Sequence, residues 1–168
     1  LGILPKDMIP VPWDYDPKPN FDRIIKPFRD AGFDVIVSPG ANNWDRLYPD
    51  LEAAYVNTHN FVRDGRKYGA IGVLNTTWDD DGEALFGMTW PALTYGAAAS
   101  WEADDSPVER FRASYDWAFY RNGDATFRQA TEKLARAHPL LDQAGVGGAY
   151  DEWYWVDPFT PEGAALMK

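Results

Sequence analysis

The stretch Ala70-Ile-Gly-Val-Leu-Asn-Thr-Thr-Trp78 decides the expected fold of this chain. It opens with a continuous apolar run long enough for a strand and passes directly into a polar loop that holds a tryptophan. The same order, an apolar run and then an aromatic, acidic loop, occurs at 7–16 and at 33–45. Continuous apolar runs are typical of parallel strands buried on both faces. Three such strands are therefore expected, and the prolines in and beside the first one weaken that prediction.

Helical patterns separate the three apolar runs. Apolar residues recur at helical spacing between 21 and 28, where Asn20 is placed to cap the helix and Gly32 to end it. A second helix is expected from about 49 or 50 to 68, ended by Gly69. Crossovers of this length join parallel strands, and the loops after the strands are chemically richer than the turns before them. The chain is therefore expected to be α/β, with its function at the carboxyl ends of its strands.

The second half of the chain is expected to be helical. Helices are predicted at 88–101, from the capping box Ser106-Pro-Val-Glu109 to about 120, and from Asp124 to about 137. Thr160-Pro161-Glu162 is a further helix start, only about two turns before the end of the sequence. Together with a first residue other than Met, this predicts that the chain is cut from a longer one.

Two open α/β architectures fit this pattern, a doubly wound sheet and a (β/α)8 barrel. The glycine-rich phosphate-binding motifs of nucleotide-binding sheets do not occur, so no nucleotide cofactor is expected. A complete barrel needs about 200–250 residues, more than the 168 present here. Three βα units plus a helical tail would form the closing part of a barrel, with residues 1–101 as the βα units and 102–168 as a helical extension packed on them.

The composition narrows the partners. Acidic residues outnumber basic ones by 26 to 16, a formal net charge of −10, which argues against nucleic acids and anionic membranes. The chain has no cysteine and only two histidines, so it lacks the ligands for a thiolate or multi-histidine metal site, and no metal is expected. Aromatic residues make up 15% of the chain, including eight tryptophans. An acidic, tryptophan-rich surface favours a carbohydrate-binding cleft.

Each expected strand end carries a tryptophan beside a carboxylate, in Trp13-Asp14, Trp44-Asp45 and Trp78-Asp79. One alternative is three ordinary turns, in which Asp is common. Another is a calcium loop at 79–83, although the spacing is not that of an EF-hand. A third is the carboxylate pair of a glycosidase. Because all three loops share the pairing, the pattern favours a sugar-binding rim.

Several stretches together resemble one enzyme family. They are Asp34-Val-Ile-Val-Ser-Pro-Gly40, Asn43-Trp44, Tyr48-Pro49, Asn60-Phe-Val-Arg-Asp-Gly65, Gly72-Val-Leu-Asn-Thr-Thr-Trp-Asp-Asp-Asp-Gly-Glu83 and Gly96-Ala-Ala-Ala-Ser-Trp101. Over roughly residues 7–120 the chain resembles the second half of glycoside hydrolase family 20, the β-N-acetylhexosaminidases, and above all a bacterial branch of it. The resemblance implies the C-terminal part of a (β/α)8 TIM barrel, about three βα units, plus a helical tail.

The resemblance also implies a mechanism. In this family the 2-acetamido oxygen of the substrate attacks the anomeric carbon, so that no enzyme nucleophile is needed. An Asp-Glu pair after the fourth strand supplies the general acid and orients the acetamide. That pair is expected upstream of this chain. Asp151-Glu152 has the same letters but follows no expected strand, so no catalytic residue is assigned here.

Five residues are expected to bind substrate by this resemblance. Trp13 matches a family tryptophan that walls the acetamido pocket. Trp78 matches the floor under the terminal sugar ring, and Asp80 takes the place of a family glutamate that binds ring hydroxyls. Asn43 and Trp44 occupy the loop in which the family has an Asp-x-Tyr motif.

The resulting expectation is part of a β-N-acetylhexosaminidase-like enzyme that removes a terminal N-acetylhexosamine. Its partner is an oligosaccharide or small sugar substrate, with no cofactor, nucleic acid or membrane. The alternative is a non-catalytic carbohydrate-binding or scaffold chain with the same half-barrel. Neither the oligomeric state nor the compartment follows from the sequence.

Overall fold

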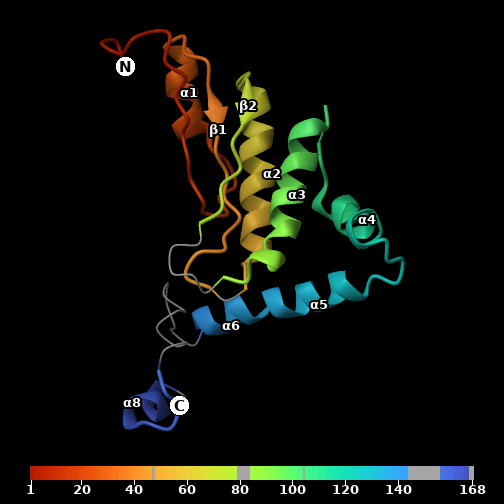
Figure 1. The fold of residues 1–168 in the computed structure, drawn as a ribbon. Helices are drawn as coiled ribbons and strands as arrows, with labels where there is room; N and C mark the ends of the chain where they lie inside the picture. The colour runs from red at the N-terminus through yellow and green to blue at the C-terminus, as the bar shows by residue number, and fades with distance from the viewer. Residues whose placement is uncertain (47, 79–83, 104, 144–155, 167–168) are drawn as a thin grey trace.

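A computed structural model describes residues 1–46, 48–78, 84–103, 105–143 and 156–166 (Figure 1). In chain order the elements are α1 (Asp22–Asp30), β1 (Ile36–Val37), α2 (Leu51–Lys67), β2 (Gly72–Val73), the short 3-10 helix η1 (Phe86–Met88), α3 (Trp90–Trp101), α4 (Val108–Tyr120), α5 (Thr126–Ala135), α6 (Ala137–Gln143) and α8 (Pro161–Leu166). The described chain is mostly helical with a two-stranded parallel sheet, so the α/β class holds in this coarse sense. None of the helices in these ranges combines the length and the apolar character that crossing a bilayer requires.

The sheet is parallel, as the long crossovers predict. Ile36 pairs with Gly72 and Val37 with Val73. Isolated parallel bridges continue the pairing at Trp13 with Ser38 and at Gly40 with Thr76. Three extended segments, 8–13, 34–41 and 71–77, therefore lie side by side in chain order.

The first of these segments forms no regular strand, and its prolines explain why. The amides of Ile36 and Ser38 donate to the carbonyl oxygens of Pro10 and Pro12, each at 3.1 Å. A proline has no N–H to donate in return, so Pro10 and Pro12 can only accept from the neighbouring segment. The strand predicted at 7–11 is therefore reduced to a bridged, extended segment.

Two apolar clusters hold the helices on this sheet. One joins α1, β1 and α2 through Phe21, Ile25, Val35, Val37 and Phe61, and its phenylalanine rings stack with centroids 4.1 Å apart. The other joins α2 to α3 and α5, with Tyr55 and Tyr95 edge to face at 5.2 Å. In Figure 1, α2 stands between the strand pair and α3, and α5 and α6 lie across the lower ends of these elements.

Several helix boundaries agree with the sequence. The carboxylate of Asp50 accepts from the amide of Ala53 at the start of α2. Gly32 and Gly69, each with a positive φ, follow the ends of α1 and α2. The hydroxyl of Thr160 accepts from the amide of Gly163 in α8.

The capping box predicted at 106–109 does not form. Pro107 is the N-cap of α4, and no side chain caps that end. Ser106 is buried, and its carbonyl oxygen accepts the hydroxyl proton of Tyr95 at 2.7 Å. Ser106 is therefore held by a contact with α3 instead of serving as a helix cap.

Asn20 does not cap α1 either, so that prediction is wrong. The N-cap of α1 is Phe21, without a side-chain cap. Its amide instead donates to the carboxylate of Asp64 on α2 at 2.7 Å, and the Arg63 guanidinium donates to the other carboxylate oxygen at 2.9 Å. Because Asp64 is 2% exposed and lies in the last turn of α2, this buried contact fixes the start of α1 to the C-terminal end of α2.

We expect Asp64→Ala to lower the free energy of unfolding by about 1–3 kcal/mol, because it leaves the Phe21 amide without a partner. Urea unfolding followed by circular dichroism measures the change. Asp22→Ala is the control, since Asp22 pairs with Lys67 at the surface, where ion pairs contribute little. Equal losses in the two variants would contradict the role of Asp64.

Candidate functional site

The carboxyl ends of the three extended segments lie together at one end of the sheet. The chain that follows β1 and β2 runs to the lower end of Figure 1, where α2 begins. The bridge between Gly40 and Thr76 and the bond from the Ala41 amide to the Thr76 carbonyl, 2.9 Å, keep the second and third segments paired up to this end. The three loops predicted to share a function are thus brought together by the parallel pairing.

Four aromatic rings meet there, and we call Trp13, Tyr15, Trp44 and Trp78 the aromatic cluster. The ring of Tyr15 is central, with its centroid 5.3 Å from that of Trp13, 4.8 Å from Trp44 and 6.3 Å from Trp78. The indole N–H of Trp78 donates to the Tyr15 hydroxyl oxygen at 2.8 Å. Trp13 is 67% and Trp78 43% exposed, while Tyr15 and Trp44 are half-buried. The cluster is therefore a partly open aromatic surface.

A buried amide lies directly behind this surface. Asn43 is 1% exposed, and its Oδ1 accepts from the Trp78 amide at 3.1 Å. Its Nδ2 has no hydrogen-bond partner among the described residues. An unpaired buried donor is costly. The Asn43 side chain therefore has an N–H donor without a partner next to Trp44 and Trp78.

The loop that carries Asn43 and Trp44 is bent at both sides. Asn42 and Asp45 have left-handed φ angles of 51° and 52°. Asn and Asp tolerate this conformation better than other non-glycine residues. Such backbone is held in place only where the surroundings determine it, and here the Asn42 side chain donates to the Tyr15 carbonyl at 3.0 Å.

The acid beside Trp13 is already engaged. The Asp14 carboxylate accepts from the Asp16 amide at 3.0 Å and from the Lys18 ammonium. The hydrogen bond with Asp14 raises the pKa of Lys18 above its ordinary value. The Asp14 carboxylate therefore stabilises its own loop and forms an ion pair with Lys18.

Four of the five residues predicted to bind substrate, Trp13, Asn43, Trp44 and Trp78, gather at this end of the sheet. Asp80 lies outside the described residues, as do the rest of 79–83 and the pair Asp151-Glu152. The residue that the sequence reasoning missed is Tyr15. Its spacing of two from Trp13, which places both side chains on one face of an extended segment, is the signal that points to it.

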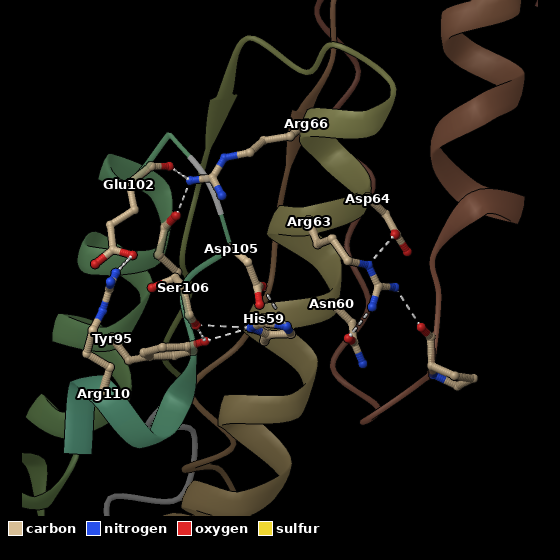
Figure 2. A network of polar contacts seen from close by, with 12 residues as sticks. His59, Asn60, Arg63, Asp64, Arg66, Tyr95, Glu102, Asp105, Ser106 and Arg110 are labelled. Carbon is tan, nitrogen blue, oxygen red and sulfur yellow. Dashed lines mark hydrogen bonds and ion pairs between the residues drawn. The ribbon is translucent and has the colours of Figure 1, made fainter. Parts of the chain in front are cut away.

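A sizeable cleft lies elsewhere on the molecule. It has a volume of about 500 Å³ and is bounded by α2, the end of α3 and the chain before α4. Figure 2 shows its polar network: the Nδ1 atom of His59 is 3.0 Å from the Tyr95 hydroxyl and 3.2 Å from the Ser106 carbonyl oxygen, and its Nε2 is 3.2 Å from the Asp105 carboxylate. Burial raises the pKa of Tyr95, which keeps this hydroxyl a donor.

The arginines beside this cleft serve the fold. Arg66 donates to the carbonyl oxygens of Ala99 and Glu102 at the end of α3 (Figure 2). Arg63 donates to Asn60 at 2.8 Å, in addition to its contact with Asp64. Since these groups bind the chain's own oxygens, the cleft is a junction between α2 and α3, and the aromatic cluster is the stronger candidate site.

No protein-family model, curated protein or solved structure matches the chain. In the part of the chain that the structure describes, no three His, Asp or Glu side chains are grouped so that they could hold a metal ion. The chemistry of the site is therefore argued from its own residues.

We expect Gly40→Ala to disturb the aromatic cluster. A β-carbon at this position would lie 2.5 Å from a ring carbon of Tyr15, so the ring has to move, and overpacking of this kind costs about 1–3 kcal/mol. Near-UV circular dichroism reports the packing of the rings. Gly72→Ala is the matched control, since its new β-carbon would meet only ordinary contacts at 3.6 Å. An unchanged near-UV spectrum in Gly40→Ala would contradict this packing.

Proposed function

We propose that the aromatic cluster binds the terminal N-acetylhexosamine of a glycan, as the sugar-binding rim of a family-20-like β-N-acetylhexosaminidase. The observation that carries the proposal is the meeting of three tryptophans and one tyrosine from three separate strand-end loops. Partly exposed rings offer flat apolar faces to the C–H groups of a pyranose. The resemblance of the strand-end sequences to this family supports the choice of sugar.

The hydrogen-bonding state of Tyr15 supports a polar ligand. Its hydroxyl oxygen accepts from the Trp78 indole, and a phenol that accepts one hydrogen bond still has its own proton to donate. An acceptor oxygen of a sugar, on a hydroxyl or an acetamido group, suits that proton. The same side chain thus offers a ring face and a directed donor, as expected of a site for an amphipathic ring.

The parallel order of the extended segments supports the barrel part of the proposal. Segments 8–13, 34–41 and 71–77 pair in chain order with helices between them, which is the arrangement of consecutive βα units. In such a barrel the carboxyl ends of the strands form the active-site face, and the aromatic cluster lies at that end. The chain is proposed to supply the last three units.

In the proposed reaction these residues bind and orient the sugar and do not transfer protons. The acetamido oxygen of the substrate closes on the anomeric carbon as the leaving oxygen takes a proton from a general acid. That acid belongs to the Asp-Glu pair expected upstream. Trp78 and Tyr15 would hold the ring so that its acetamido group faces the anomeric carbon, a contribution through positioning.

We expect the chain to bind N-acetylglucosamine through the cluster. Trp78→Ala is expected to weaken the affinity about fivefold to 150-fold, since stacking on one aromatic ring contributes roughly 1–3 kcal/mol. Ligand-observed NMR titration gives the dissociation constants. Trp101→Ala is the matched control, because Trp101 is 91% exposed on α3 and is not part of the cluster. Equal losses in both variants, or no binding by the unmodified chain, would overturn the proposal.

We expect the 168-residue chain by itself not to hydrolyse a chromogenic N-acetylglucosaminide, because the catalytic pair is assigned upstream. Release of the chromophore above background, abolished by a substitution within the chain, would place the acid here and contradict that assignment. The alternative is a non-catalytic carbohydrate-binding chain. The upstream coding sequence distinguishes it from the enzyme. An Asp-Glu pair at an earlier strand end favours the enzyme, and its absence favours the binding chain.

A further inference from the structure

One buried side chain of α2 contacts both the first and the second strand-end loop. Asn57 is fully buried, at 0% exposure. Its Nδ2 donates to the carbonyl oxygens of Asp14 and Asp16, each at 2.9 Å. Its Oδ1 accepts from the amide of Gly40 at 3.1 Å. A single carboxamide therefore joins two loops that are more than twenty residues apart in the sequence.

These contacts lie immediately around the aromatic cluster. Asp14 and Asp16 are the neighbours of Tyr15 on either side, so Asn57 holds the backbone on both sides of the central ring. Gly40 is the residue whose missing side chain leaves room for that ring. The carboxamide thus sets where the Tyr15 backbone lies relative to the loop that leads to Trp44.

Few side chains could replace Asn57. The contacts require two donors and one acceptor on a short planar group, which only a carboxamide offers at this length. A carboxylate keeps the acceptor and has no donor when it is ionised. A serine hydroxyl has one donor proton and does not reach as far.

We propose that Asn57 is a positioning residue for sugar binding: it fixes the Tyr15 ring against Trp44 and Trp78 without touching the ligand. The inference rests on the proposed function of the aromatic cluster. It assigns the geometry of the rim to a helix residue behind it, because Asn57 holds the backbone on both sides of the Tyr15 ring and the Gly40 amide of the next loop. Ring orientation in a sugar site decides affinity, since stacking and the donor bond of Tyr15 have to be made together.

Asn60 provides a matched control one helical turn further along α2. Its Nδ2 donates to the carbonyl of Lys18 at 2.8 Å, and its Oδ1 accepts from Arg63 (Figure 2). It too is an amide that holds a loop from α2. Its loop contact lies beyond the aromatic cluster, so the same substitution there tests the loss of an amide–loop contact without the loss of ring placement.

The test compares Asn57→Asp with Asn60→Asp in the full chain, using N-acetylglucosamine as the probe. We expect Asn57→Asp to weaken the affinity at least tenfold, the effect of about one buried hydrogen bond, and Asn60→Asp to change it less than twofold. The indole N–H resonance of Trp78, identified by its loss in Trp78→Phe, is expected to shift in the Asn57 variant only. Asn57→Ser, which introduces no buried charge, replaces Asn57→Asp if that variant does not fold.

Two outcomes are distinguished. If the unmodified chain binds the sugar and the Asn57 variants bind as the Asn60 variants do, with the Trp78 resonance unmoved, the positioning role is wrong and the proposed function stands. If the unmodified chain does not bind the sugar, the proposed function fails and this role fails with it.

Discussion

The structure depends on the need to satisfy backbone hydrogen-bonding groups that lie in loops and at helix ends, outside the sheet. Each named strand is two residues long, and isolated bridges and backbone hydrogen bonds extend the pairing only as far as the strand ends. Buried N–H and C=O groups beyond them also need partners. Side chains of α2 supply them. Asp64 binds the amide at the start of α1, Asn57 binds two strand-end loops, and Arg66 binds the end of α3. One helix thus supplies partners for backbone groups in the strand-end loops and at the ends of two other helices.

This arrangement leaves Trp13 and Trp78 exposed to solvent, while buried side chains hold the backbone of the aromatic cluster. The Asn57 and Asn42 amides hold the backbone around Tyr15, and the Trp78 indole bond holds its hydroxyl. A site whose backbone is already ordered loses less conformational freedom when a ligand binds. Three loops that are each irregular can therefore form one defined surface, and the left-handed residues on both sides of Asn43 and Trp44 are tolerated because their neighbours determine them.

The sequence predicts what depends on local pattern. The apolar runs at 33–37 and 70–74, the Asp50 cap and the glycines that end α1 and α2 all involve residues a few positions apart. It does not predict contacts that replace a local preference by a distant partner. Asn20 was expected to cap the first helix, whereas the Phe21 amide at its start donates to Asp64. Asn57 lies mid-helix and has partners up to 43 positions away. The gathering of Trp13, Trp44 and Trp78 was predictable only because parallel pairing brings strand ends together.

The cleft and the exposed aromatic rings lie at different places on this molecule, and the rings are the better guide to the candidate site. The cleft beside His59 is large, but its imidazole and its arginines bind the chain's own carbonyl and carboxylate oxygens. At the aromatic cluster the Asn43 amide keeps a donor without a partner among the described residues, and the Tyr15 hydroxyl keeps its proton. A buried donor without a partner is costly, whereas the His59 and Arg66 side chains at the cleft already have partners within the chain. The exposed faces of Trp13 and Trp78 lie next to those donors, and flat apolar faces beside hydrogen-bond donors are what a pyranose ring requires.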